Sequence, residues 1–185
     1  MNNNNEMWLK PSNSSLSLKQ KLKLALWLFV QKYIFKFIPH KLNSLRIIIL
    51  KLFGAKIGKN NFIHQSANIY MPWNLKMGNN SSIDFDAIIY SWDKVIIGDF
   101  VSISYKVNIN TATHDYTDPY FKLITKPIYI EDGVFIGTES YISLGVTLGR
   151  MSVIGARSVV VKNTEPYYVY IGHPCRKYKK REEQK

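Results

Sequence analysis

Cysteine is almost missing from this chain, because Cys175 is the only one among 185 residues. A single cysteine excludes an intrachain disulfide and a zinc site built from cysteines. The four histidines, His40, His64, His114 and His173, show no metal-ligand spacing, so we expect no metal site. With one cysteine and no recognisable export signal, the expected compartment is the cytoplasm.

Long apolar runs are also missing. The longest in the N-terminal part, Leu24 to Val30, has seven residues, whereas a membrane-spanning helix needs ~20. Lysines flank or interrupt this run, and no small-residue cleavage site follows it, which argues against a signal peptide. We therefore expect no spanning segment.

Acidic residues are scarce, with 13 Asp and Glu against 25 Lys and Arg. The resulting net charge of +12 raises nucleic acid or a membrane as partners. The excess lies at the ends: residues 1–53 carry +8, residues 54–161 are neutral and residues 162–185 carry +4. Because a nucleic-acid binder usually concentrates charge on its folded surface, and because zinc-finger, RNP and Gly-rich phosphate-loop spacings are missing, we expect no nucleic-acid partner.

An internal repeat fills the middle of the chain. Aliphatic residues recur at every sixth position in four runs: Ile57, Ile63, Ile69 and Leu75; Met77, Ile83, Ile89 and Val95; Ile97, Ile103 and Ile109; Ile130, Ile136, Ile142, Leu148, Ile154 and Val160. Glycine directly follows six of them, at Gly58, Gly78, Gly98, Gly137, Gly149 and Gly155. This hexapeptide pattern predicts a parallel β-helix, in which three six-residue rungs close a triangular coil of about 18 residues. One aliphatic side chain per rung points inward, and stacked coils supply the core.

The N-terminal part reads as two helices. Leu16 to Ile38 is rich in apolar and aromatic residues and lysines, and Pro39 is expected to end that helix. Ser44 to Phe53 reads as a second, short helix with Ser44 as N-cap and Gly54 as C-terminal stop. Two alternatives stay open: both helices pack on the main body or a neighbouring subunit, or the first lies on an anionic membrane surface.

The chain thus divides into four segments. Residues 1–15, rich in Asn and Ser, are expected to be a disordered lead-in. Residues 16–53 form the helical segment, residues 54–165 the β-helix, and residues 166–185 a basic C-terminal extension. The repeat is broken by an inserted loop, residues 110–127, and loops inserted into a regular solenoid often carry function.

His114 lies near the start of the inserted loop. An imidazole there can act as a general base near neutral pH. Carboxylates are close in sequence at Asp115 and Asp118. The alternative is a surface histidine that caps a turn.

Five segments resemble one family. They are Thr113 to Gly137 (THDYTDPYFKLITKPIYIEDGVFIG), Leu52 to Asn60 (LFGAKIGKN), Met71 to Asn80 (MPWNLKMGNN), Val153 to Asn163 (VIGARSVVVKN) and Gly172 to Lys177 (GHPCRK). They are similar to hexapeptide-repeat acetyltransferases of the colanic-acid and exopolysaccharide type, and to the maltose, galactoside and nodulation O-acetyltransferases. The resemblance covers about Leu22 to Lys180. It implies an all-β fold, a left-handed parallel β-helix with N-terminal α-helices and a short C-terminal extension.

The resemblance also implies an activity. Acetyl-CoA would be the donor and a sugar hydroxyl the acceptor, in surface polysaccharide biosynthesis. The expected assembly is a homotrimer with sites in the clefts between neighbouring β-helices. His114 aligns with the catalytic histidine of the family, which makes it the expected general base.

Acceptor-binding residues follow from the same alignment. Asp84 falls where the maltose and galactoside enzymes have an asparagine that holds the acceptor, so an amide is replaced by a carboxylate. Asp84 or Asp86 could bind a sugar hydroxyl or orient the imidazole, or could be solvated turn residues. Tyr116, in the inserted loop, is a third expected acceptor contact.

On the donor side, Thr138 aligns with a small hydroxyl residue whose backbone approaches the thioester and pantetheine arm. Ala156 aligns with a position whose main chain contacts the arm. Val161 replaces a threonine of the relatives, so a side-chain hydroxyl bond is lost there. Lys162 and Arg176 align with basic residues that approach the CoA phosphates, as suits an ammonium and a guanidinium.

The predicted reaction is direct transfer, with an oxyanion held by a backbone N–H near Thr138 and without an acyl-enzyme. Cys175 is read as structural. Two alternatives remain: an amino-sugar N-acetyltransferase on the same fold, and a non-catalytic β-helix that binds or assembles. The acceptor sugar is not specified by the sequence, although the basic, aromatic first helix favours a membrane-linked one.

Overall fold

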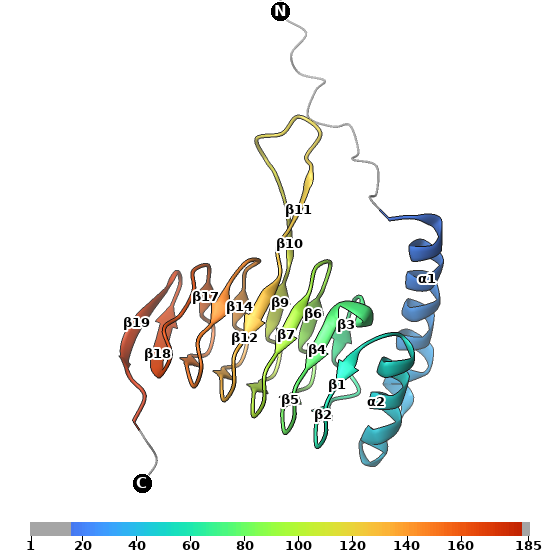
Figure 1. Cartoon of the computed structure of the whole chain (residues 1–185), viewed down its shortest axis with the longest axis horizontal. Helices are drawn as coiled ribbons and strands as arrows, with labels where there is room; N and C mark the ends of the chain where they lie inside the picture. The colour runs from blue at the N-terminus through green and yellow to red at the C-terminus, as the bar shows by residue number, and fades with distance from the viewer. Residues whose placement is uncertain (1–15, 183–185) are drawn as a thin grey trace, which may run out of the picture.

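Short parallel strands stacked in three sheets make up the body of the molecule in the computed structural model, which describes residues 16–182 (Figure 1). The lead-in expected at residues 1–15 lies outside the described residues. Each coil of the solenoid visits the three sheets in turn. The three sheets are called A, B and C below.

The strands of the three sheets are as follows. Sheet A contains β1 (Lys56–Ile57), β4 (Leu75–Met77), β7 (Val95–Ile97), β12 (Ile128–Ile130) and β15 (Thr147–Leu148). Sheet B contains β2 (Phe62–Ile63), β5 (Ser82–Ile83), β8 (Ser102–Ile103), β13 (Phe135–Ile136), β16 (Val153–Ile154) and β18 (Tyr168–Gly172), with β19 (Cys175–Lys180) antiparallel at its edge. Sheet C contains β3 (Asn68–Ile69), β6 (Ile88–Tyr90), β9 (Asn108–Asn110), β14 (Tyr141–Ile142) and β17 (Val159–Val160).

The predicted hexapeptide core is confirmed. Every aliphatic residue of the four runs is buried, and equivalent residues pair across coils, as Ile63 does with Ile83 and Ile83 with Ile103. Glycine is required where coils approach closely: a Cβ on Gly137 would lie 2.7 Å from the backbone nitrogen of Ala156. The glycines that follow the buried positions therefore let the coils stack.

The predicted coil length of about 18 residues is wrong for the first coils. Ile57 pairs with Met77 and Met77 with Ile97, so these coils have 20 residues. The two extra residues of each coil lie at the corner between sheets C and A, which in the first coil contains a short 3-10 helix, η4 (Pro72–Asn74). Eighteen residues separate the later partners Tyr129 and Thr147.

The first helix is shorter than predicted. The α-helix α1 (Leu18–Tyr33) begins with a capping box between Ser17 and Gln20 and is followed by a 3-10 turn, η2 (Phe35–Phe37). The α-helix ends before Ile38 because the chain turns to bury Phe35, whose ring packs edge-on against Trp27 at 5.9 Å.

The second helix, α2 (Asn43–Leu52), follows a further 3-10 turn, η3 (His40–Leu42). Ser44 is not its N-cap, because the helix begins one residue earlier with Leu42 at the cap position and no side-chain cap bond. Gly54 is confirmed as the stop, since its φ of +100° lies in the left-handed region and its N–H bonds to the Lys51 oxygen.

Both helices close the first coil of the solenoid (Figure 1). Arg46, fully buried, donates from Nε to the Ile63 oxygen and from its terminal nitrogens to the oxygens of Ile38, Pro39 and His40. The Asn43 amide accepts from the Ile63 N–H and donates to the Asn61 oxygen. These side chains satisfy backbone groups that an open sheet edge would leave unpaired.

The insertion at residues 110–127 forms a β-hairpin rather than an irregular loop. Strands β10 (Ala112–His114) and β11 (Leu123–Thr125) pair antiparallel, and the hairpin projects away from the solenoid (Figure 1). Within residues 16–182, no helix has the length and apolarity to cross a membrane.

Candidate active site

One edge of the prism, where the chain passes from sheet B to sheet C, carries predicted donor and acceptor residues together. We call it the B–C edge. Asp84 follows β5, Thr138 follows β13 and Ala156 follows β16. Backbone bonds stack these turns in register, for example from the Asp84 N–H to the Ile103 oxygen and from the Arg157 N–H to the Thr138 oxygen. Asp84 thus lies two coils from Thr138 along the same edge.

The main chain at Thr138 and Ala156 is open to a ligand. Among residues 16–182, no atom accepts a hydrogen bond from the N–H of either residue. Thr138 is half-buried and Ala156 is exposed. The two N–H groups, one coil apart, are therefore free to bind carbonyl or oxyanion groups of a ligand lying along the edge.

Asp84 and Asp86 lie in one turn of the B–C edge. Asp84 accepts from the Phe85 N–H at 2.7 Å through Oδ1, and Asp86 has a φ of +56° and donates its N–H to the Ser66 hydroxyl. Phe85 between them is stacked on Tyr105, with ring centroids 4.2 Å apart. Sequence reasoning missed this aromatic pair, which the 20-residue spacing of the coils would have revealed.

His114 ends strand β10 of the hairpin. Its Nδ1 lies 2.6 Å from the main-chain oxygen of Phe121, and its ring stacks on that of Phe121 at 4.8 Å. Because a carbonyl oxygen can only accept, this bond requires the proton on Nδ1 and leaves the lone pair of Nε2 free in the neutral ring.

Among residues 16–182 of the single chain, no carboxylate forms a hydrogen bond with His114, so an orienting role of Asp84 or Asp86 stays a prediction. The two carboxylates near it in sequence are also engaged elsewhere. Asp115 accepts from the hydroxyl and N–H of Thr117, which lowers the pKa of the Asp115 carboxyl, and Asp118 accepts from the Tyr120 N–H. Both therefore shape the tip of the hairpin.

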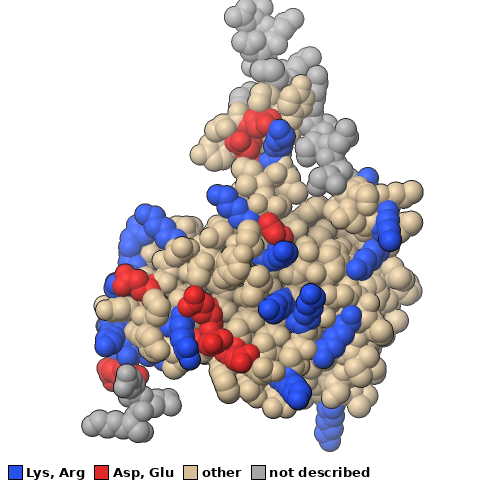
Figure 2. Space-filling model, viewed as in Figure 1, with Lys and Arg blue, Asp and Glu red and all other residues tan. Residues whose placement is uncertain are grey.

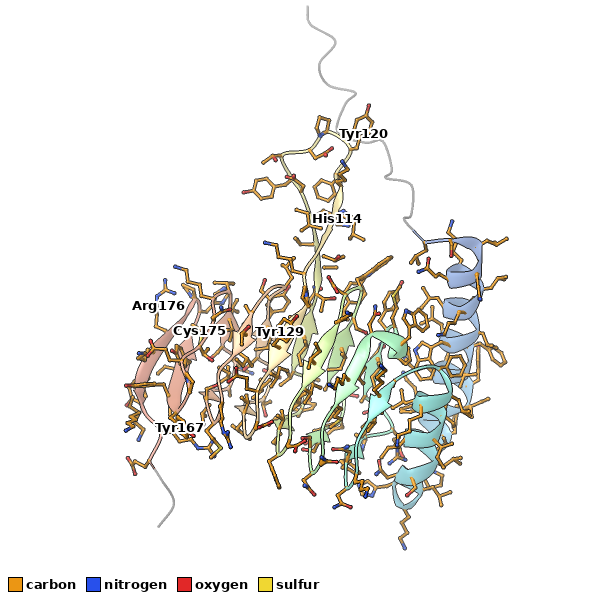
Figure 3. All side chains as sticks on the ribbon, in the orientation of Figure 1. His114, Tyr120, Tyr129, Tyr167, Cys175 and Arg176 are labelled. Carbon is orange, nitrogen blue, oxygen red and sulfur yellow. The ribbon has the colours of Figure 1, made fainter. Side chains whose placement is uncertain are left out.

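The hairpin does not close a site with its own solenoid. Figure 3 shows Tyr120 at the tip of the hairpin and His114 about midway between the tip and the solenoid, and the side chains of His114 and Tyr116 are exposed, Tyr116 to 77%. Asp84 belongs to the B–C edge, whereas the hairpin leaves the corner between sheets C and A. The single chain thus brings Asp84, Thr138 and Ala156 to one edge but does not bring His114 to them.

Lys162 and Arg176 meet at a hollow of about 390 Å³ at the C-terminal end of the solenoid. Its lining also includes the core residue Val160 and residues to which sequence reasoning gave no role in binding, namely Asn163, Thr164, Glu165, Tyr170 and Lys177. Lys177 pairs with Glu165, whereas Lys162 and Arg176 form no ion pair within residues 16–182. Their charges are therefore available to an anion. Val161 is half-exposed and is not part of the lining.

Cys175 lines the same hollow, and Figure 3 shows it beside Arg176 at the C-terminal end of the solenoid. Burial raises the pKa of its thiol, although Ser158 and the Arg176 N–H partly oppose the rise. A protonated thiol is a poor nucleophile, in agreement with a structural role. Among residues 16–182, no three His, Cys, Asp or Glu side chains are grouped so that they could hold a metal ion.

Comparison with known proteins finds relatives that are named as acetyltransferases. No family model matches the chain. It is 36% identical over 154 residues to the putative colanic acid biosynthesis acetyltransferase WcaF of Escherichia coli (strain K12), covering 83% of this chain and 85% of that protein. It is 32% identical over 141 residues to the galactoside O-acetyltransferase of the same strain, covering 75% and 69%.

Solved structures of acetyltransferases also match the fold of this chain. A galactoside acetyltransferase in complex with coenzyme A matches with a TM-score of 0.83 and 27% identity over 90% of this chain and 84% of that chain. The hexapeptide-repeat containing acetyltransferase VCA0836 of Vibrio cholerae matches with a TM-score of 0.83 at 23% identity, covering 90% and 95%. Together with the stacked six-residue rungs, these relatives show that the chain belongs to the hexapeptide-repeat acetyltransferases, enzymes built on a left-handed parallel β-helix.

Proposed function

We propose that this acetyltransferase moves the acetyl group of acetyl-CoA to a sugar hydroxyl used in surface polysaccharide biosynthesis, with His114 as general base. The observation that carries the proposal is the 2.6 Å contact between His114 Nδ1 and the Phe121 oxygen. It fixes the tautomer in which Nε2 can take a proton, and together with the stacking on Phe121 it holds the ring in place on the hairpin. Relatives named for colanic acid biosynthesis and for galactoside acetylation support a saccharide acceptor.

The donor is assigned to the B–C edge and the C-terminal hollow. The free N–H groups of Thr138 and Ala156 suit the carbonyl groups of a pantetheine arm, and Lys162 and Arg176 suit the CoA phosphates. The exposed Val161 side chain offers only apolar contact. The coenzyme A in the related galactoside acetyltransferase structure supports this donor class.

The acceptor is assigned to Asp84, Asp86 and Tyr116. Asp84 uses Oδ1 for the Phe85 N–H, and its other oxygen is free to accept from a sugar hydroxyl. The neighbouring Phe85 and Tyr105 rings offer an apolar surface beside the two carboxylates.

The chemical step transfers the acetyl group directly. Nε2 of His114 removes the hydroxyl proton while the oxygen attacks the thioester carbonyl, and the Thr138 N–H donates to the oxyanion. The C–S bond then breaks, and His114 returns the proton to the CoA thiolate. The products are the O-acetyl sugar and CoA.

A homotrimer completes the site in this proposal. The hairpin carries exposed aromatic residues, Tyr116, Tyr120 and Phe121, and stands clear of its own solenoid. Exposed aromatic surface of this kind is typical of an interface. The hairpin of one subunit would therefore bring His114 to the B–C edge of the next. We place the reaction in the cytoplasm, where acetyl-CoA is made.

The donor assignment is tested first by calorimetric titration with acetyl-CoA, because this needs no acceptor. We expect one saturable site per chain, weakened at least about tenfold by Lys162→Ala or Arg176→Ala, each removing a charge-assisted bond. Lys59→Ala, an exposed lysine at the opposite end of the solenoid, is the matched control and should bind normally. A folded trimer that fails to bind acetyl-CoA would overturn the donor assignment.

The role of His114 as general base is tested with two variants. His114→Ala removes the whole ring, whereas His114→Asn keeps a donor toward the Phe121 oxygen but has no base. We expect both to lose about 10²–10⁴ in kcat and to keep acetyl-CoA affinity. Recovery of activity in His114→Asn would mean that His114 serves only to hold the hairpin. An ester product is lost in mild alkali, whereas a surviving amide would indicate an amino-sugar acceptor instead.

A further inference from the structure

Helix α1 has apolar side chains on two opposite sides. The side that packs on the solenoid carries Leu24, Trp27 and Gln31, all buried. Large exposed residues follow a second stripe, at Leu18, Leu22, Leu26, Phe29 and Tyr33. At about 100° per residue, spacings of four, four, three and four place these five on one face, opposite the buried one. A helix that is apolar on both faces is normally covered on both.

The neighbouring elements carry further exposed apolar side chains. Leu45, Ile48 and Leu52 of α2 are spaced three and four apart and are exposed, Leu52 to 79%. Phe37, next to the end of α1, is 76% exposed. We call the surface formed by these nine side chains the outer helical face. It belongs to the helical layer that closes the N-terminal end of the solenoid (Figure 1).

The charge around the outer helical face has one sign. Residues 16–53 contain seven lysines and Arg46 and no acidic residue. Arg46 is buried, but the lysines are exposed. On α1, Lys19 and Lys23 flank one side of the stripe, and Lys21 and Lys32 the other, by the same helical periodicity. Figure 2 shows basic side chains and no acidic ones at this end of the molecule.

The exposed apolar side chains and the surrounding lysines together indicate what kind of partner covers the outer helical face. A second copy of the same face would bring lysines against lysines, with no carboxylate in residues 16–53 to compensate. A bilayer with anionic lipid offers an apolar layer for the stripe and negative headgroups for the lysines, whose long stems reach outward. We propose that the outer helical face lies on the surface of a membrane that contains anionic phospholipid, with α1 in the plane of the interface.

Membrane binding does not depend on the proposed acetyl transfer, but the two fit together. If the acceptor is a saccharide on a lipid carrier, an enzyme held by its helical end is already at the surface where the acceptor is. This consequence rests on the proposed function, whereas the binding itself is tested without any substrate.

The test is flotation of the full-length protein with vesicles. One set contains phosphatidylcholine alone, and the other phosphatidylcholine mixed with phosphatidylglycerol. We expect binding to the anionic vesicles, weakened by salt. Leu22→Gln combined with Phe29→Gln should reduce the partition coefficient at least about tenfold, because two large apolar side chains leave the interface. Both positions are exposed, so the fold should persist.

Matched control variants test whether vesicle binding depends on the helical layer. Phe100→Gln combined with Tyr178→Gln removes two aromatic residues that are equally exposed but lie outside the helical layer, and should bind like the wild type. Lys19→Gln with Lys32→Gln should weaken binding, and Lys179→Gln with Lys180→Gln, at the other end, should not.

Three results would overturn the proposal. The first is a wild type that does not bind anionic vesicles, and the second is a Leu22 and Phe29 variant that binds as well as the wild type. The third is a light-scattering result in which this variant dissociates an assembly that the wild type forms without lipid, which would assign the outer helical face to a second copy.

Discussion

The indole N–H of Trp27 donates to the main-chain oxygen of Ile69 at 2.6 Å, in a fully buried contact between α1 and β3. The bond replaces the strand partner that β3 lacks at the end of sheet C. Gln31 supports it one turn later, because its amide accepts from the Ile69 N–H and donates to Asn68. Helix α1 is thus held to the solenoid by bonds to a strand edge as well as by apolar packing.

Trp27→Phe should lower the free energy of unfolding by about 1–3 kcal/mol, because a buried carbonyl is left without a donor. Trp92→Phe is the matched control, since the Trp92 Nε1 is buried without a partner in the described chain. Trp92→Phe removes an unsatisfied N–H group, so it should lower the free energy of unfolding clearly less than Trp27→Phe does. Urea unfolding of both variants checks this, and equal losses would show that the indole bond to Ile69 is unimportant.

Asp84→Ala should raise the KM for the acceptor about tenfold or more, because a bond between a carboxylate and a hydroxyl is lost. The acetyl-CoA affinity should not change. Asp93→Ala is the control: Asp93 Oδ1 accepts from the next N–H at 2.7 Å, as Asp84 does, but outside the B–C edge. Steady-state kinetics with both substrates varied would separate the two effects. A loss shared by both variants would point to turn stability instead.

Much of the fold could be predicted because its core is periodic. Ile130 to Val160 keep a strict six-residue step, and each member is buried in its rung. The break after Ile109 marked the hairpin, because nothing else in a regular solenoid interrupts the stacking. The glycines after the buried positions mark the corners at which coils approach most closely.

The parts that could not be predicted depend on tertiary packing. The 20-residue length of the first coil arises at a corner where Met71 and Pro72 are buried, which local sequence does not reveal. The end of α1 is set by burial of Phe35 against Trp27. The partner of His114 is a main-chain oxygen seven residues away, and its position follows from hairpin register. Sequence reasoning named carboxylates near His114 and, as the alternative, a surface histidine that caps a turn, but it could not specify this oxygen.

Cys175→Ala should keep acetyl transfer within about twofold, because direct transfer uses no acyl-enzyme. Burial raises the pKa of the Cys175 thiol, so the thiolate is disfavoured near neutral pH. Activity measurements together with intact-mass spectra after incubation with acetyl-CoA check this. An acetyl adduct that is present in the wild type and missing in the variant would contradict direct transfer.

His64 should make the protein less stable in mild acid. Burial lowers the pKa of its imidazole, with Arg46 and His40 acting in the same direction and Asp84 and Asp86 opposing it. The Ser66 N–H also donates to Nδ1 at 3.2 Å, a bond that only the neutral form accepts. The folded state therefore prefers neutral His64, and below about pH 6.5 the unfolded state binds the additional proton. The free energy of unfolding should therefore fall as the pH drops from about 6.5 through the lowered pKa of His64.

The His64→Asn variant tests this. Its amide keeps an acceptor for the Ser66 N–H but does not titrate, so its urea midpoint should fall less over this pH range while matching the wild-type trend above pH ~7.5. An identical acid dependence in the two proteins would show that other groups cause it.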